Sequence, residues 1–398
     1  MAAVNDSLPL SYDFAVPQKI VFGWGRRREV GSLARSLGRR AFLVCGAPFL
    51  VENGVIDEIS GEIRGQGADT VFLESILHEP EVADVDRVAA RVRDLGLKPD
   101  DFVLAVGGGA AIDLGKAVAA MAVNDQSPTV RDYLEGVGRD LKLLQDPLPV
   151  LAMPTTAGTG AEATRNAVIS SYDPPFKKSL RSEKILPRIA LVDPELTVSV
   201  PRAVTAASGM DAITQLLESF ISRKAQPVPR ALAVEGLRRA VPAIVEAVEN
   251  PGSRPAREAM AHAAMLSGMA LANSGLGMAH GVAAALGVHC RVPHGAACAL
   301  LLPTALRVNR SVRQVEMAWL SRELFDAAPA DPEARIDRLI DEISSLCDRV
   351  GVPRRLSQVG VTAEQIPAIA GDSRGSSMSG NPRELSDEEL TRILQDLL

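Results

Sequence analysis

The first third of the chain alternates short, continuous apolar runs with longer amphipathic segments. Apolar runs bounded by glycine or charge predict buried strands, and the segments between them have helical periodicity. Strands that are apolar throughout and are joined by helices are typical of a parallel sheet covered on both faces. We therefore predict an α/β nucleotide-binding domain, whose ligand binds beyond the carboxyl ends of the strands. The expected strands are 40–46, 69–76 and 101–109, and the expected helices are 29–38, 49–67, 81–96 and 110–123.

The flanking segments complete the predicted organisation. Residues 12–24 alternate apolar and polar side chains, which predicts a β-ribbon at the start of the fold. Residues 149–164 predict a strand that runs into a Thr/Gly-rich turn, and from about Pro201 onward the sequence is helical. A chain of 398 residues ordinarily forms two domains. We expect an α/β dinucleotide-binding domain at 1–200 and an all-α metal and substrate domain at 201–398.

Charge and cysteine usage narrow the functional classes. The net charge is −6 and lysine- or arginine-rich runs are missing, which argues against nucleic-acid binding. The four cysteines have no CxxC spacing and predict reduced thiols in a cytoplasmic protein. Neither a signal peptide nor an apolar stretch of about 18 residues is evident, so we expect no membrane association. A β-ribbon can pair across a two-fold axis, so we expect a homo-oligomer such as a dimer.

Two glycine-containing loops are candidate phosphate sites. Gly107, Gly108 and Gly109 follow an apolar run and open a helical segment, where bare backbone N–H groups bind phosphate. The spacing is neither G-x-G-x-x-G nor a Walker loop, so a tight strand-to-helix turn is an equal alternative. The second loop, 154–160, offers three threonine hydroxyls. Lys177 or its neighbour could neutralise a phosphate or reach a ribose hydroxyl, although lysines in polar loops are often only solvated.

Four potential metal ligands lie in two apolar, helix-like runs of the second half. Asp211 and Gln215 are four residues apart, so they share one face of a helix. His280 and His294 could point into one cavity if the chain bends at Pro293. A carboxylate with imidazoles is a ligand set for Zn²⁺ or Fe²⁺. The alternatives are a helix-capping aspartate and histidines satisfied in the core, but the chain has only five histidines in total.

Five motifs in order give the chain a family resemblance. They are GGGAAIDLGK, PTTAGTGAEAT, GMDAITQLLESF, GMAHGVAAALG with VPHGAACALLLP, and NPRELSDEEL. Together they resemble the motifs of the iron-containing (group III) alcohol dehydrogenases, in the dehydroquinate-synthase-like superfamily. The resemblance runs from about residue 12 to 398. It implies an α/β nucleotide-binding domain, an all-α domain and an active site in the cleft between them.

The resemblance also implies roles for individual residues. The expected cofactor-binding residues are Gly46, Gly107, Gly108, Gly109, Asp113, Thr155, Thr156, Thr159 and Lys177. The expected metal ligands are Asp211, Gln215, His280 and His294, of which Asp211, His280 and His294 are also expected to be catalytic.

Three positions depart from the family pattern. Gln215 replaces a histidine ligand, and Ala284 replaces a histidine that relays a proton, which leaves water or His289 for that role. Gly46 replaces an aspartate that binds the adenosine ribose in NAD-specific members. Without that carboxylate a 2′-phosphate is not repelled, so both NAD and NADP are expected.

The function expected from the resemblance is metal-dependent and NAD(P)-linked. Hydride transfer would interconvert a small-molecule alcohol and an aldehyde or ketone, with Fe²⁺ or Zn²⁺ in the active site. A metal-independent reductase of the maleylacetate reductase type is the nearest alternative, because of Gln215 and Ala284. Two further alternatives are a lyase of the dehydroquinate synthase type and a protein that binds nucleotide without turnover.

Overall fold

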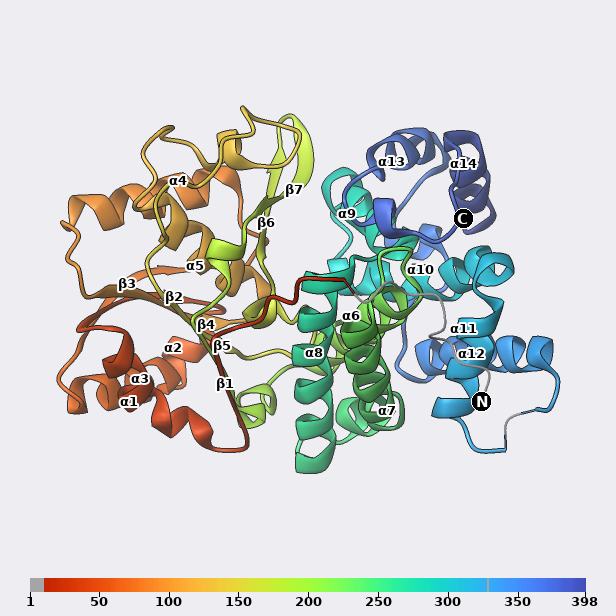
Figure 1. Cartoon of the computed structure of the whole chain (residues 1–398), viewed down its shortest axis with the longest axis horizontal. Helices are drawn as coiled ribbons and strands as arrows, with labels where there is room; N and C mark the ends of the chain where they lie inside the picture. Colours follow the sequence, from red (N-terminus) through yellow and green to blue (C-terminus); the bar gives the residue numbers. More distant parts are fainter. Residues whose placement is uncertain (1–10, 328) are drawn as a thin grey trace. The chain divides into compact units, whose positions relative to one another are not determined.

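The computed structural model describes residues 11–327 and 329–398. The chain forms two compact units, of which one contains residues 15–156 and 160–199. The other contains residues 200–327, 329–398 and 157–159 together with residues 11–14. The first unit is an α/β structure and the second is helical (Figure 1). The separate roles predicted for 1–200 and 201–398 stay predictions.

The first unit is built on a six-stranded sheet in which every neighbouring pair is parallel. In spatial order the strands are β1 (Lys19–Phe22), β8 (Ile189–Val192), β5 (Val150–Pro154), β4 (Asp101–Gly107), β2 (Arg40–Cys45) and β3 (Asp69–Ser75). The helices are α1 (Val30–Leu37), α2 (Phe49–Glu52), α3 (Val55–Gly65), α4 (Val82–Asp94) and α5 (Gly109–Met121). The predicted α/β class is confirmed.

Side-chain alternation along the central strands builds a core on each face of the sheet. In β2, Phe42 and Val44 pack into one core, which also receives Val88 of α4. Leu43, between them, packs into the other core with Ile59 of α3. Successive strand side chains point to opposite faces, so a strand that is apolar at every position must be covered twice. This is why the central strands have continuous apolar runs.

Two local predictions for this unit are wrong. Residues 12–24 do not form a ribbon: β1 is a single edge strand that pairs in parallel with β8, at Lys19 with Ile189. Residues 49–67 form two helices rather than one, because the chain turns at Gly54, whose φ of 74° is left-handed. Glycine adopts that conformation without steric cost.

An antiparallel hairpin completes the first unit. Its strands are β6 (Asn166–Tyr172) and β7 (Pro175–Arg181), paired from Asn166 with Arg181 to Tyr172 with Pro175. The hairpin follows the Thr/Gly-rich loop after β5, and the polar side chains described below attach it to α5.

The second unit is all helical, as predicted. Its helices are α6 (Arg202–Ile221), α7 (Pro227–Glu249), α8 (Arg254–Ser274), α9 (Met278–Cys290), α10 (His294–Asn309), α11 (Gln314–Leu324), α12 (Pro332–Arg349), α13 (Ile366–Asp372) and α14 (Asp387–Asp396). Helices α6, α7 and α8 run side by side, and α6 also packs against α10 (Figure 1). Two close approaches make the packing tight. A Cβ at Gly236 of α7 would lie 2.7 Å from Leu216 of α6, and a Cβ at Gly209 of α6 would lie 2.9 Å from Met260 of α8.

Within 11–327 and 329–398, no single helix is both long and apolar enough to cross a membrane. The helices α8 and α9 meet the length and composition criteria only as a pair, and they are bent by 101° at the break between them.

Candidate active site

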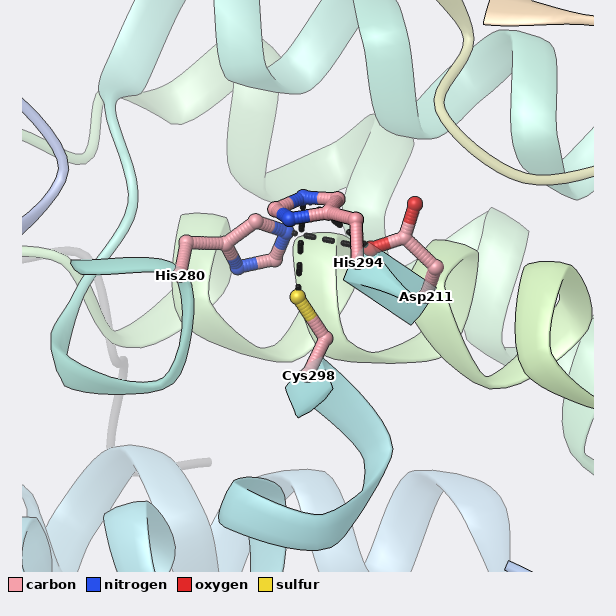
Figure 2. A group of neighbouring side chains, drawn as sticks. All are labelled: Asp211, His280, His294 and Cys298. Atoms are coloured by element: carbon pink, nitrogen blue, oxygen red, sulfur yellow. Dashed lines mark hydrogen bonds and ion pairs between the residues drawn. The ribbon is translucent and has the colours of Figure 1, made fainter. Parts of the chain in front are cut away.

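Three helices of the second unit bring four ligand side chains together (Figure 2). Asp211 is in α6, His280 in α9 and His294 at the first position of α10, with Cys298 one turn later. Helix α9 ends before Pro293, which directly precedes α10, so the expected break is present. The break allows two histidines from successive helices to face the same aspartate.

The ligand atoms are close enough to share one ion. Each residue offers one such atom, and the four atoms all lie within 4.8 Å of one another. Asp211 Oδ1 lies 3.4 Å from His280 Nε2 and 3.9 Å from His294 Nε2. Cys298 Sγ lies 3.7 Å from His294 Nε2. The two imidazole rings are 5.6 Å apart with an interplanar angle of 62°, so their edges converge rather than stack (Figure 2).

Two buried atoms of this cluster lack hydrogen bonds. Asp211 Oδ1 and His280 Nε2 face each other, and neither forms a hydrogen bond with any residue that the structure describes. Buried polar atoms without partners are costly, and an ion or ordered water usually satisfies them. One carboxylate, two imidazoles and one thiol are also the donor types of zinc and iron sites. The residues therefore fit a divalent metal ion.

The electrostatics of the cluster favour a positive charge. Burial raises the pKa of Asp211, but His280 and His294 lower it by more, so it lies below its ordinary value. Burial lowers the pKa of His280, yet the acidic groups around it, led by Cys298 and Asp211, raise it well above its ordinary value. Burial raises the pKa of Cys298 to about 12. A proton on His280 or a bound cation can balance the buried carboxylates.

Glu218 fixes both the His280 ring and the start of α9. Its side chain is 2% exposed, and Oε2 accepts a hydrogen bond of 2.7 Å from His280 Nδ1. The same carboxylate accepts from the backbone N–H groups of Gly277, at 3.0 Å, and Ala279, at 2.7 Å. A Cβ at Gly277 would lie 2.8 Å from Glu218 Oε1, so the approach requires glycine. With Nδ1 bound to Glu218, Nε2 is the nitrogen that faces Asp211.

The side chain of Gln215 is engaged by neighbouring polar groups. It lies one turn after Asp211, and its Nε2 donates to Thr159 O at 3.0 Å and to Ser267 Oγ at 2.8 Å. These two bonds hold the amide plane in place. Metal binding by Gln215 stays a prediction, as does a cofactor contact by Thr159.

His289, which the sequence analysis left as a possible proton relay, forms an ion pair with another side chain. His289 Nε2 lies 2.6 Å from Asp372 Oδ2, in an ion pair whose carboxylate is 57% exposed. Ala284 lies within α9 and has no titratable group. A relay through His289 stays a prediction.

Cys298 was not among the residues predicted from sequence. The signal was nevertheless present, because Cys298 follows His294 by the same four residues that separate Gln215 from Asp211. Residues four apart share a helix face, so a thiol at this position faces the same way as the histidine.

In the first unit, the predicted phosphate turn joins β4 to α5. Gly108 is the N-cap residue of α5, and among the described residues no side chain caps this helix. Gly108, Gly109 and Ala110 are only partly buried. The helix therefore presents its backbone N–H groups at a partly exposed end, which is the arrangement that binds phosphate.

Close backbone packing explains two glycines of this turn. A Cβ at Gly107 would lie 2.7 Å from the Ala111 side chain and 2.8 Å from the Gly46 backbone. A Cβ at Gly46 would lie 3.1 Å from Gly107 Cα, and Gly46 N donates to Val106 O at 2.7 Å. The end of β2 thus lies directly against the phosphate turn. The second loop is also close, since Thr155 N donates to Gly107 O at 3.0 Å.

Asp113 has a structural partner in addition to its predicted cofactor role. Asp113 Oδ1 lies 2.8 Å from the fully buried Lys116 Nζ, and Oδ2 accepts from Val168 N at 3.0 Å. Lys116 donates to Ala161 O at 2.9 Å and to Thr164 Oγ1 at 3.0 Å. Burial raises the pKa of Asp113 despite Lys116. The pair connects α5 to the Thr/Gly loop and the hairpin.

Lys177 is likewise paired. Its Nζ lies 2.5 Å from Glu79 Oε1, and its side chain is only 7% exposed. Glu79 also accepts from Ser170 Oγ at 3.3 Å. Ribose binding by Lys177 stays a prediction, as does binding by Thr155 and by Thr156, whose Oγ1 would lie 3.3 Å from a Cβ at Gly108.

Comparison with known proteins agrees with these features. Residues 17–194 match the sequence model "Iron-containing alcohol dehydrogenase", and residues 205–398 match "Fe-containing alcohol dehydrogenase family, C-terminal". Long-chain-alcohol dehydrogenase 1 of Geobacillus thermodenitrificans is 33% identical over 88% of this chain and 87% of its own length. NAD-dependent methanol dehydrogenase of Bacillus methanolicus is 30% identical over 97% of this chain and 100% of its own length. The crystal structure of a 1,3-propanediol oxidoreductase superposes with a TM-score of 0.91 at 30% identity, covering 98% of this chain and 100% of that one.

The two family matches cover nearly the whole chain, and the relatives align along almost their full length. An aspartate and two histidines converge in the helical unit, as the chemistry of the family requires. The chain therefore belongs to the iron-containing alcohol dehydrogenase family, a family of NAD(P)-linked oxidoreductases that act on alcohols and aldehydes.

Proposed function

We propose that this chain is a metal-dependent, NAD(P)-linked oxidoreductase that interconverts a small primary alcohol and its aldehyde. The observation that carries the proposal is the convergence of the ligand atoms of Asp211, His280 and His294, with the buried atoms Asp211 Oδ1 and His280 Nε2 lacking hydrogen bonds to the described residues. A divalent ion bound there supplies Lewis-acid stabilisation of alkoxide charge, and a bound nicotinamide supplies the hydride acceptor or donor.

The residues of the helical unit have separate tasks in this proposal. Asp211 supplies the negative charge that makes cation binding favourable, and His294 supplies a neutral nitrogen from the next helix. Glu218 keeps His280 in the tautomer whose Nε2 faces the cluster, because it accepts from Nδ1. The buried surroundings limit access of water to the reacting groups.

The loops of the α/β unit are proposed to hold the cofactor. The N-terminus of α5 at Gly108 and Gly109 binds the pyrophosphate, with the hydroxyls of Thr155 and Thr156 beside it. Gly46 leaves no carboxylate at the end of β2, so we propose that NADP is accepted as well as NAD. Thr159, Asp113 and Lys177 remain part of the proposed cofactor site. In this scheme 1–200 binds the dinucleotide and 201–398 binds metal and substrate.

A turnover assay with metal removal tests the proposal. The chelated protein is reloaded with Zn²⁺ or Fe²⁺, and absorbance of the reduced nicotinamide is followed with NAD or NADP and primary alcohols of increasing length. The relatives are named for methanol, 1,3-propanediol and long-chain alcohols, so the series covers that range. Activity should require a metal and be lost in Asp211→Ala and His280→Ala.

The matched control is His262→Gln, since His262 lies in α8 and outside the cluster. That variant should keep metal and activity. Inactivity of the wild type with both metals and both cofactors would refute the proposal. Full activity of chelated protein and of His280→Ala would instead favour the metal-independent reductase.

We further propose that the protein is cytoplasmic and forms a homo-oligomer. The expected ribbon is replaced by β1, but β1 is an edge strand, and its unpaired backbone groups can still pair with a second copy. All four cysteines are free thiols, which suits a reducing compartment. Light scattering measured during size-exclusion chromatography tests the oligomeric state, and a monomeric mass would contradict it.

A further inference from the structure

We propose that the Cys298 sulfur is the fourth protein ligand of the metal ion, in place of the side chain at position 215. This inference rests on the metal site of the proposed function. It makes the site an oxygen, two nitrogens and a sulfur, which suits a thiophilic divalent ion such as Zn²⁺ better than a hard ion such as Mg²⁺ or Mn²⁺.

Helix geometry explains how the fourth ligand can come from α10 instead of α6. Asp211 and Gln215 are a pair four residues apart on α6, and His294 and Cys298 are the equivalent pair on α10. In each pair the second side chain lies on the same helix face as the first. The two helices pack against each other, so either pair can supply a ligand one turn further along.

The distances allow the four atoms to bind one ion, which would take the substrate oxygen as a fifth ligand. With metal–nitrogen and metal–oxygen bonds of about 2.0–2.1 Å and a metal–sulfur bond of about 2.3 Å, tetrahedral ligands lie about 3.6 Å apart for S and N and about 3.3 Å apart for N and O. Cys298 Sγ lies 3.7 Å from His294 Nε2. Asp211 Oδ1 lies 3.4 and 3.9 Å from the two imidazole nitrogens. The remaining pairs lie within 4.8 Å, so the four atoms can approach one ion with side-chain shifts of up to about 1 Å.

Gln215 has a different set of interactions. Its amide nitrogen donates to Thr159 O and Ser267 Oγ, and Ser267 Oγ in turn donates to Ala264 O at 2.7 Å. These bonds link α6 to α8 and to the loop at residue 159. An amide oxygen is also a harder donor than a thiolate and carries no charge. The side chain at 215 therefore stabilises the helical unit, while the thiol completes the ligand set.

The binding step is a simple exchange of a proton for a metal bond. The Cys298 S–H bond breaks, its proton passes to solvent, and a sulfur–metal bond forms with no change of oxidation state. Among the described residues, Cys298 is the cysteine that belongs to the ligand group, so its thiol is the one that meets the ion.

Cobalt substitution tests the assignment directly, because a thiolate ligand gives Co²⁺ a charge-transfer band in the near ultraviolet. The chelated protein is loaded with Co²⁺ as wild type, Cys298→Ser, Gln215→Ala and Cys347→Ser. The last variant is a matched control, because Cys347 is also a buried free thiol but is not part of the cluster. Zn²⁺ affinity of each variant is measured by competition with a chromogenic chelator.

We expect the band in wild type, Gln215→Ala and Cys347→Ser, and its loss in Cys298→Ser. Zn²⁺ should bind Cys298→Ser at least about tenfold more weakly, since even an outer partner of a ligand contributes 10- to 100-fold. The proposal is overturned if Co²⁺ binds the wild type without the band, or if Cys298→Ser keeps it. Metal binding without the band leaves the proposed function standing. A band without alcohol turnover refutes the proposed function alone.

Discussion

Replacing Glu218 by glutamine tests how the metal cluster is held. The carboxylate accepts two bonds of 2.7 Å, from Ala279 N and His280 Nδ1, and one of 3.0 Å from Gly277 N. In glutamine one oxygen becomes an NH₂ group, so at least one of these buried donors loses its acceptor, at about 1–3 kcal/mol. The other two bonds lose their charge assistance, which weakens each by roughly half, or about 0.75 kcal/mol. The expected loss in free energy of unfolding is therefore about 2.5–4.5 kcal/mol.

The same substitution should weaken metal binding. The Nδ1 bond orients the His280 ring and raises the basicity of Nε2, and loss of such a partner costs about 10- to 100-fold in metal affinity. Urea unfolding of the chelated protein measures the first effect and equilibrium dialysis with Zn²⁺ measures the second. Glu316→Gln is the control, because Glu316 pairs with the buried Arg230 outside the cluster. It should lower stability without changing affinity.

Unchanged Zn²⁺ affinity in Glu218→Gln, together with lower stability, would refute this reasoning. Glu218 would then be only the cap of α9. Equal affinity losses in both variants would show that general destabilisation, rather than the bond to His280, controls metal binding.

Two further predictions concern the α/β unit. Burial raises the pKa of Glu162 from 4.5 to about 7, so the folded state holds this proton more tightly than the unfolded chain. The pKa difference stabilises the folded state fully below pH 4.5, and this stabilisation is lost as the pH rises to about 7. The loss in free energy of unfolding over this range is on the order of 3 kcal/mol. In urea unfolding between pH 5 and 8, the stability of Glu162→Gln relative to wild type should increase as the pH rises, and a constant difference would contradict this. Gly107→Ala should lower the free energy of unfolding by about 2–4 kcal/mol, because its Cβ would lie 2.7 Å from Ala111 and 2.8 Å from Gly46. It should also abolish cofactor binding measured by calorimetry. Gly61→Ala in α3 is the control, because a Cβ at Gly61 would have no neighbouring atom within 4 Å. Its free energy of unfolding should rise by about 0.5–1 kcal/mol. Similar losses of stability in both variants would count against the steric argument.

The sequence by itself determined the order and type of most elements. Continuous apolar runs such as 101–107 identify buried strands because each face of a parallel sheet needs apolar side chains. The glycines after β4 indicate a tight strand-to-helix turn, and the structure explains Gly107, because only glycine can pack this closely against Gly46. The motifs around Asp211, His280 and His294 also gave the family, which the comparisons confirm.

Only the tertiary structure decided which distant residues meet. The β1 strand pairs with β8, about 170 residues away, so a local alternation pattern predicted a ribbon that does not exist. Lys177 pairs with Glu79, 98 residues away, and His280 pairs with Glu218, 62 residues away, and nothing in the local sequence marks either partner. Cys298 lies beside Asp211, His280 and His294 only because α9 and α10 are separated by a break that returns the chain toward α6. Periodicity reports which face of an element is buried, whereas a site depends on which faces are packed together, and that is set by contacts far apart along the chain.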